Sequence, residues 1–224
     1  MDKRFAVIIA FVVLVAVVAV AYSSYYSTLL EMQQYRPNIS QQVGPVNLSN
    51  GSPILGESSA PITIVEFGDY QCEGCYHWFH NTRAEIIDNY VETGKAKLVF
   101  LDLPFLGRDS PKAAHASYCA EDQGKYWEYH ATLYNFQEGI DDGWASQDRL
   151  SSFAYNLGLD VEQFDDCMGS EKYAKRIMAN YDQAVNQEVL ATPSFILISP
   201  DGLFKKIQGA QPYSVFAKII EQMP

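Results

Sequence analysis

Two cysteines separated by two residues are the feature of this chain that most clearly suggests chemistry. Cys72 and Cys75 enclose Glu73 and Gly74 in a CxxC motif. Thiols at this spacing can close a disulfide, and the thiolate form of cysteine is the nucleophile in thiol–disulfide exchange. The motif therefore indicates a redox-active dithiol.

The elements around the motif predict different roles for the two cysteines. Residues 62–67 form a β-branched and aromatic run typical of a buried strand. Phe79, Ile86 and Tyr90 then recur at the spacing of one helix face. Cys72 would open this helix, where free backbone N–H groups and the helix dipole can lower a thiol pKa from about 8.5 to between about 3.5 and 7.5. We therefore expect Cys72 to be the attacking thiol. Cys75, one turn inside the helix, would be the resolving thiol, which closes the disulfide onto Cys72.

Other uses of a CxxC motif are a zinc half-site, a haem site or a structural disulfide. A zinc site normally needs a second closely spaced ligand pair, whereas Cys119 and Cys167 are isolated. His77 and His80 follow the motif, so a metal site made by the CxxC motif and His80 stays open as an alternative. Covalent haem attachment needs histidine where Tyr76 stands, which excludes it.

Length and composition are those of one globular domain with an insertion. The chain has 224 residues, of which 48% are hydrophobic and 19% charged. Its net charge is −11, and without Asp2, Lys3 and Arg4 the remainder carries −12. Such an acidic surface argues against nucleic-acid binding.

The N-terminus predicts export. After Lys3 and Arg4, residues 5–22 form an uncharged stretch of 18 residues, and we interpret residues 1–22 as a transmembrane signal anchor with a cytoplasmic N-terminus. The small residues Ala19 and Ala21 also fit a signal-peptide cleavage site, which would release a secreted protein. Both interpretations export the CxxC motif, and an even number of cysteines suits an oxidising compartment.

A flexible extracytoplasmic tether is expected over residues 23–53. The stretch from Ser23 to Ser59 is rich in Gln, Ser, Asn and Tyr and contains three prolines. It includes sequons at Asn38, Asn47 and Asn50, which matter only in an organism that glycosylates exported proteins.

The remaining pattern predicts an α/β domain over residues 54–224 with an all-helical insertion at about 108–188. The first helix should end at Gly94, and Ser110 is a plausible cap for the next. The expected strands cover residues 62–67, 97–103, 194–199 and 203–208. The expected helices cover residues 110–122, 126–136, 147–156, 161–168, 170–188 and 213–222.

Several ordered features together resemble the DsbA-like thiol–disulfide oxidoreductases of the thioredoxin superfamily. They are PITIVEFGDY at residues 61–70 leading into the CxxC motif, residues 113–114 through QGKYWEYH at 123–130, and ATPSF at 191–195. The resemblance runs from about Ile54 to the C-terminus. It implies a thioredoxin fold with an inserted helical domain and the oxidation of thiols in exported proteins.

The resemblance assigns Thr192 and Pro193 to a cis-proline loop. A cis X–Pro bond is uncommon in folded proteins, so one at this place would be a specific turn. It would hold the Thr192 backbone beside Cys72, where a bound peptide can pair with it as an added strand. Without the resemblance, an ordinary trans turn would be the simpler interpretation.

Glu66 lies on the expected strand, six residues before Cys72. The family places an acid here, beneath the disulfide, as a proton acceptor for the buried cysteine. Burying a carboxylate is costly and would raise its pKa toward the range useful for acting on Cys75. The alternative is a glutamate at a strand end that reaches solvent.

The dipeptide between the cysteines departs from the family pattern. Many strongly oxidising members carry a histidine there, whereas this chain has Glu73 and Gly74. A carboxylate beside Cys72 should raise the thiol pKa and make the disulfide a milder oxidant, unless His77 compensates.

The resemblance also implies a structural disulfide between Cys119 and Cys167, because related sequences often pair cysteines at these places. It would tie the helical insertion together and stabilise it by a few kcal/mol. Two buried free thiols are the alternative.

The leading interpretation is a membrane-tethered dithiol oxidase of exported proteins. The two cysteines carry the electrons, so no further cofactor is expected. The resemblance implies recycling by a membrane quinone-linked partner of the DsbB or VKOR type. The alternatives are a disulfide reductase or isomerase with the same site, or a non-catalytic metal-binding module that uses the cysteines and a histidine.

Overall fold

The computed structural model describes residues 19–20, 22–23, 39–40 and 45–224. Within these residues the chain folds around a mixed five-stranded sheet. The strands are β1 (Ile39–Ser40), β2 (Ile62–Gly68), β3 (Ala96–Asp102), β4 (Ser194–Ile198) and β5 (Phe204–Gln208). Their order is β1-β5-β4-β2-β3. Strand β2 runs parallel to β3 and antiparallel to β4, and β5 is antiparallel to both β4 and β1.

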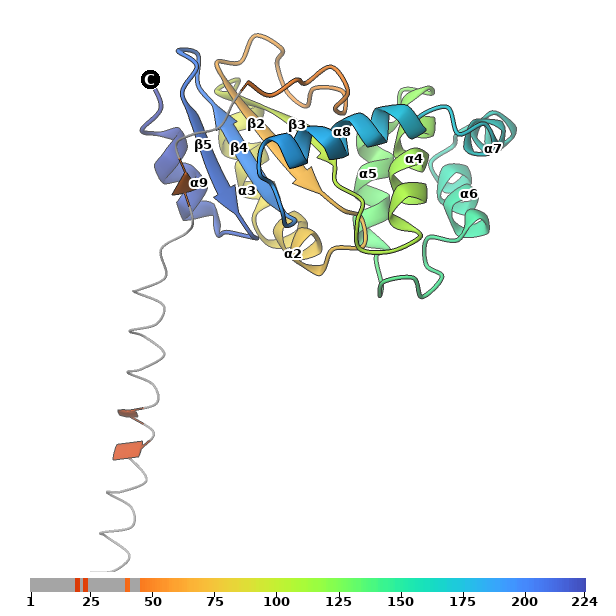
Figure 1. Cartoon of the computed structure of the whole chain (residues 1–224), viewed down its shortest axis with the longest axis horizontal. Coiled ribbons are helices and arrows are strands. Elements are labelled where there is room, and N and C mark those ends of the chain that lie inside the picture. The colour runs from red at the N-terminus through yellow and green to blue at the C-terminus, as the bar shows by residue number, and fades with distance from the viewer. Residues whose placement is uncertain (1–18, 21, 24–38, 41–44) are drawn as a thin grey trace, which may run out of the picture. The chain divides into compact units, whose positions relative to one another are not determined.

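Helices cover both faces of the sheet, as Figure 1 shows. On one face Ile64 packs with α2 (Glu73–Asn81), α3 (Arg83–Ile86) and α9 (Tyr213–Ile220). On the other, residues 65 and 67 pack with α8 (Ala174–Asn186). Because successive side chains of a strand point to opposite faces, Glu66 lies on the same side as α2.

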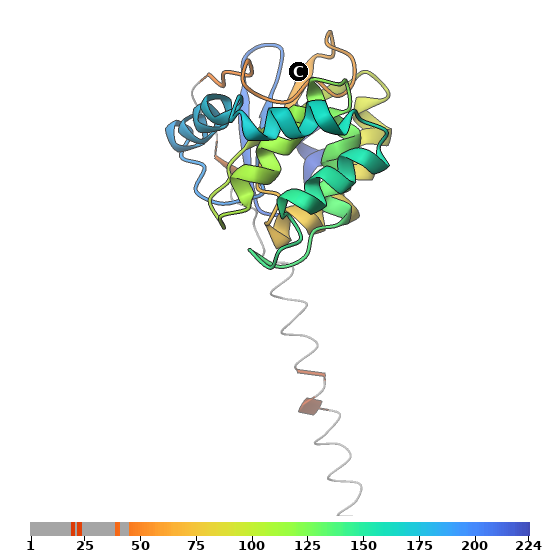
Figure 2. The same ribbon diagram turned by 90° about the vertical axis from the view of Figure 1, so that its right-hand side faces the viewer.

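The inserted helices gather beside β3, at one edge of the sheet. They are α4 (Ser110–Glu121), α5 (Tyr126–Asn135), α6 (Gln147–Asn156) and α7 (Val161–Gly169). Figure 2 views them from their own side, in front of the sheet. They share a core that includes the fully buried Tyr129 and Phe164. A disulfide joins Cys119 of α4 to Cys167 of α7, with 5.8 Å between their Cα atoms.

The sequence predicted one helix that opens at Cys72 and ends at Gly94, but the structure breaks it. Helix α2 stops at Thr82, whose backbone lies outside the helical region (φ −125°, ψ −39°) and whose hydroxyl donates to the Gln211 carbonyl at 3.2 Å. Helix α3 and the π-helix η1 (Ile87–Val91) then follow, and Gly94 ends the segment with φ +70°. The tertiary contact at Thr82 therefore overrides the helical periodicity.

One predicted helix cap and one predicted helix start also differ from the structure. Ser110, expected as a cap, is already the first residue of α4, and Asp109 precedes it. Helix α8 begins at Ala174 instead of residue 170, because Glu171 takes a left-handed backbone (φ +50°).

The ordered domain begins earlier than the predicted boundary at Ile54. The Ser52 backbone N–H donates to the Phe100 carbonyl at 2.8 Å, and its hydroxyl accepts from the Phe100 N–H at 2.9 Å. The Asn50 carbonyl accepts from Tyr118 of α4 at 3.3 Å. Strand β1 also lies within the stretch that was expected to have little regular structure.

The expected membrane segment, residues 1–22, lies outside the described residues except for residues 19, 20 and 22. Among the helices that the structure describes, none combines the length and the apolarity needed to cross a membrane.

Candidate active site

Helix α2 positions the two cysteines of the CxxC motif, which are both free thiols. Cys72 precedes the helix with an extended backbone, and its sulfur accepts a hydrogen bond from the Cys75 backbone N–H at 3.2 Å. First-turn N–H groups have no partner within a helix, so this sulfur satisfies one of them. Cys72 is 6% exposed, whereas Cys75 is fully buried.

The two thiols differ in acidity. A hydrogen bond from the Cys75 side chain has the largest effect and lowers the pKa of Cys72 to about 7, against the opposing effect of burial. Burial raises the pKa of Cys75 well above the ordinary value of a thiol. A single thiolate on the pair will therefore reside on Cys72, the more accessible sulfur.

The loop before β4 lies against Cys72. The peptide bond between Thr192 and Pro193 is cis. The Cys72 thiol donates to the Thr192 carbonyl at 3.3 Å. A Cβ atom on Gly74 would come within 3.0 Å of Pro193 Cδ, so glycine leaves space for this loop to approach the helix. The structure thus brings Thr192, Pro193 and Gly74 together around Cys72.

Glu66 is buried on β2, with 1% of its surface exposed, and does not reach solvent as the alternative interpretation required. Among the described residues, no group donates a hydrogen bond to either carboxyl oxygen. Burial raises the pKa of Glu66 to about 8, although the positive charge of Arg83 opposes the rise. The negative charge of Glu66 in turn contributes to the raised pKa of Cys75. At neutral pH Glu66 is mainly a neutral acid, able to give or take a proton.

Glu73 has less influence on Cys72 than the sequence suggested. Its side chain is 91% exposed, and its Oε1 lies 3.6 Å from His77 Nε2. Solvent screens a charge in this position. Among the main influences on Cys72, the carboxylate that raises its pKa is the buried Asp69.

Asp69 was not recognised from the sequence. Its carboxylate accepts from the backbone N–H groups of Gln71 at 2.8 Å, Phe105 at 3.0 Å and Leu106 at 3.1 Å. It therefore fixes the turn that leads from β2 into Cys72. The sequence feature that could have indicated its role is an acidic residue between the end of a buried strand and a CxxC motif.

His80 does not complete a metal site with the cysteines. One ring nitrogen lies 2.9 Å from the Tyr76 carbonyl, and the other lies 3.1 Å from Asn135 Oδ1. Within the described part of the chain, the group of three potential ligands is His115 with Cys119 and Cys167, and these two sulfurs already form a disulfide.

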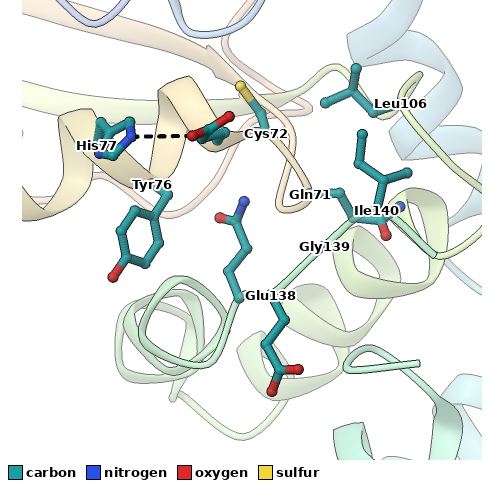
Figure 3. Close-up of a pocket in the computed structure, with 10 residues that line it drawn as sticks. Gln71, Cys72, Tyr76, His77, Leu106, Glu138, Gly139 and Ile140 are labelled. Atoms are coloured by element: carbon teal, nitrogen blue, oxygen red, sulfur yellow. Dashed lines mark ion pairs between the residues drawn. The ribbon is translucent and has the colours of Figure 1, made fainter. Parts of the chain in front are cut away.

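A groove of about 670 Å³ opens beside Cys72. Figure 3 shows that residues from the start of α2 lie on one side of it, and Leu106 and Ile140 on another. The reactive sulfur thus lies next to a space that can receive part of another molecule.

Comparisons with known proteins agree with this arrangement. The thioredoxin family profile matches residues 48–222. A probable disulfide bond formation protein D from Bacillus anthracis is 29% identical over 144 residues, which cover 62% of this chain and 66% of that protein. The chain therefore spans just under two thirds of the length of this relative.

Solved structures extend the similarity over more of the chain. The crystal structure of oxidised BdbD from Bacillus subtilis has a TM-score of 0.71 and 25% identity, and covers 82% of this chain and 97% of that one. The structure of alpha-DsbA1 from Wolbachia pipientis has the same fold, with a TM-score of 0.68 and 24% identity over 80% of this chain and 92% of that one.

Proposed function

This chain belongs to the thioredoxin family, and we propose that it is a DsbA-like thiol–disulfide oxidoreductase that introduces disulfides into exported proteins. The observation that carries the proposal is the asymmetry of the cysteine pair. Cys72 is the more accessible thiol, with a pKa of about 7, and Cys75 is fully buried with a raised pKa. Such a pair suits attack at one sulfur and departure of the other.

The reaction starts from the oxidised Cys72–Cys75 pair. A substrate thiolate attacks the Cys72 sulfur, the disulfide bond breaks, and Cys75 leaves as a thiolate that takes up a proton. The substrate's second thiolate then attacks the substrate sulfur of this mixed disulfide and releases Cys72 as a thiolate. Two electrons thereby pass from the substrate to the protein, and a low pKa makes Cys72 a good leaving group.

Glu66 would supply the proton that Cys75 needs. With a pKa of about 8, raised mainly by burial, the carboxyl is mostly protonated at neutral pH. Its side chain lies on the α2 side of β2, and its charge interacts with those of both cysteines, which supports this role. When the pair is oxidised again, the same group would accept the proton from Cys75.

Thr192 and Pro193 would hold the substrate. The Thr192 carbonyl already contacts the Cys72 sulfur, so an extended peptide that reaches this sulfur passes along the same loop. Peptides often bind by pairing their backbone with that of the protein as an added strand.

We further propose that the protein works outside the cytoplasm on a retained N-terminal anchor. The uncharged stretch of residues 5–22 supports the anchor, and the Cys119–Cys167 disulfide suits an oxidising compartment. Recycling would then require an electron acceptor, for which a membrane quinone-linked partner of the DsbB or VKOR type is suitable. The two cysteines carry the electrons within the protein itself.

A specific observation favours a second candidate, a disulfide reductase with the same site. The pKa of about 7 at Cys72 is close to that of the thioredoxin cysteine, about 7, and far from that of DsbA, about 3.5. A less stabilised thiolate makes a less oxidising disulfide.

The reduction potential of the full-length protein, equilibrated in glutathione buffers, decides between the two candidates. A value well above −270 mV, toward the roughly −120 mV of DsbA, supports the oxidase. A value near the roughly −270 mV of thioredoxin supports the reductase. A Cys72→Ser variant is the control, since it cannot form the active-site disulfide.

A further inference from the structure

Helices α4 and α7 bring three potential metal ligands together in the helical insertion. His115 and Cys119 lie one turn apart on α4, and Cys167 lies on α7. One ligand atom of each residue lies within 4.8 Å of those of the other two. Figure 1 shows α7 at the outer end of the insertion, away from α2 and the CxxC motif. This cluster is therefore distinct from the site of disulfide exchange.

The imidazole of His115 has a free nitrogen in a buried place. The residue is 7% exposed, and among the described residues its Nε2 atom has no hydrogen-bond partner. Burial lowers the pKa of His115 below its ordinary value, and a hydrogen bond with the Cys167 backbone opposes this effect only in part, so the ring is neutral at neutral pH. Histidines that bind metals typically donate one ring N–H to such a backbone group and bind the ion through the other nitrogen.

The two cysteines are placed for one shared ion as well as for a disulfide. Their Cα atoms are 5.8 Å apart, and both residues are buried, with 1% of Cys119 and 8% of Cys167 exposed. A tetrahedral Zn²⁺ ion with Zn–S bonds of about 2.3 Å holds two sulfurs about 3.8 Å apart. Sulfurs at that separation fit Cα atoms at this distance, so rotation of the side chains can open a reduced pair around an ion.

A pocket of about 490 Å³ gives solvent access to the cluster. His115 lines it, as does Met168, which directly follows Cys167. Glu171 lines it too, and the negative charge of Glu171, which acts on His115, favours the entry of a cation. Two thiolates and one imidazole are ligands typical of zinc, and a water molecule in the pocket can take the fourth position.

We propose that the reduced form of this cluster binds one Zn²⁺ ion through the sulfurs of Cys119 and Cys167 and the Nε2 atom of His115. A reducing dithiol gives two electrons and two protons to the disulfide, becomes a disulfide itself and leaves two thiols in the chain. The ion then displaces both thiol protons and binds the thiolates. The insertion thus has two alternative cross-links between α4 and α7, a disulfide under oxidising conditions and a metal ion under reducing conditions.

Titration with Co²⁺ tests the site, because tetrahedral cobalt bound to thiolates has visible absorption and a thiolate charge-transfer band. The full-length protein carries Cys72→Ser and Cys75→Ser, which remove the active-site thiols. Its disulfide is reduced with a phosphine in urea, and Co²⁺ is added either before or after refolding without oxygen, so that a reduced chain that needs metal to fold is also tested. One ion per chain should bind with the charge-transfer band, and Zn²⁺ should displace it. A reduced protein without the band in both cases, or an equal band in the oxidised protein, would overturn the proposal.

Histidine variants of the same protein locate the ion. His115→Gln keeps a polar side chain that can hydrogen-bond to the Cys167 backbone but is a poor zinc ligand, so the affinity of the reduced protein for Zn²⁺ should fall by at least about tenfold. His77→Gln is the matched control, because His77 lies on α2 and is outside the cluster, and it should leave the affinity within about twofold of the parent protein. Circular dichroism of the oxidised variants checks their fold, and His115→Asn replaces His115→Gln if the latter does not fold. Equal affinities in the His115 and His77 variants would refute the site.

Thermal unfolding tests the exchange of one cross-link for the other. Zn²⁺ should raise the unfolding midpoint of the reduced protein and leave that of the oxidised protein unchanged, because a ligand stabilises only a folded form that binds it. An equal rise in both forms would assign the zinc to another part of the chain and refute the proposal, as would the lack of any rise in the reduced form.

Discussion

The backbone N–H of Cys75 donates a hydrogen bond to the sulfur of Cys72 at 3.2 Å, across the first turn of α2. The same two residues differ in burial, because Cys75 is fully enclosed whereas Cys72 is the last residue before the helix. The donor favours negative charge on Cys72, and enclosure disfavours it on Cys75. Their roles in disulfide exchange therefore follow from their positions on one helix.

Alkylation of the reduced protein should follow the ionisation of Cys72. Its pKa of about 7 means that the thiolate fraction, and with it the iodoacetamide rate, rises with pH and is half-maximal near pH 7. Cys75 should stay unmodified at that pH, because burial raises its pKa. Rates measured from pH 4 to 10, with mass spectrometry of the labelled peptide, check this. A midpoint near the 8.5 of a free cysteine would contradict it.

The side chain at position 75 provides a matched pair of variants for the same measurement. Cys75→Ala removes the side-chain donor that most lowers the pKa of Cys72, so the alkylation midpoint should move up toward the ordinary thiol value. Cys75→Ser keeps a hydroxyl donor and should shift the alkylation midpoint less. Equal midpoints in both variants would show that the backbone donor and the helix terminus suffice.

Replacing Glu66 with Gln should slow disulfide exchange without preventing folding. The amide fills the same space on β2 but cannot deliver a proton to Cys75. General acid–base assistance commonly contributes 10²–10⁴-fold, so a loss of at least about tenfold is expected near neutral pH. Stopped-flow rates of disulfide exchange from pH 5 to 9 measure this loss. Rates equal to those of wild-type protein over this range would exclude the proton-transfer role.

The same variant should change how stability depends on pH. The folded protein holds the Glu66 proton up to a pKa of about 8, whereas the unfolded chain releases it near 4.5. The unfolded state thus binds fewer protons between these values, and the free energy of unfolding falls as pH rises. Glu66→Gln should remove this slope, with a relative gain on the order of a few kcal/mol between pH 5 and 8. Urea unfolding at both pH values measures the gain, and parallel pH profiles would contradict it.

Much of the fold could be predicted because its determinants are local. Residues 62–67 form a β-branched and aromatic run that lies in β2, and α6 occupies the predicted residues 147–156. The break at Thr82 could not be predicted, since it depends on the carbonyl of Gln211, 129 positions later in the chain.

The candidate site likewise contains residues that could be recognised from the sequence and residues that could not. The CxxC spacing and Glu66 are visible in the sequence, and the resemblance supplied Pro193. Asp69 and the Gln71–Asp141 contact were missed because their partners come from other segments of the chain. A polar residue in a loop shows its role only once the backbone groups it contacts are known.

The Cys119–Cys167 disulfide should stabilise the inserted helices without taking part in exchange. It links α4 to α7 across 48 positions. A double Cys119→Ala, Cys167→Ala variant should lose about 2–4 kcal/mol of unfolding free energy, because its unfolded chain is less restricted. Its rate with dithiothreitol should stay within about twofold of wild type. Thermal unfolding tests the loss of stability, and the rate with dithiothreitol tests the independence from exchange. A tenfold loss of that rate in folded protein would connect the disulfide to the active site.

Substitutions at Glu73 test whether this protein is a milder oxidant than relatives with histidine between the cysteines. Glu73→His replaces an exposed negative charge, paired with His77 at 3.6 Å, by a group that can be positive beside the Cys72 thiolate. Stabilising the thiolate stabilises the reduced form, so the reduction potential should become more oxidising. Each tenfold change in the equilibrium with glutathione corresponds to about 30 mV, and a shift of tens of mV is expected. Glu73→Gln removes the negative charge without adding a positive one and should shift the potential less, because solvent screens the exposed carboxylate. An unchanged or lower potential in Glu73→His would mean that the hydrogen bonds around Cys72, and not the dipeptide, determine its oxidising strength.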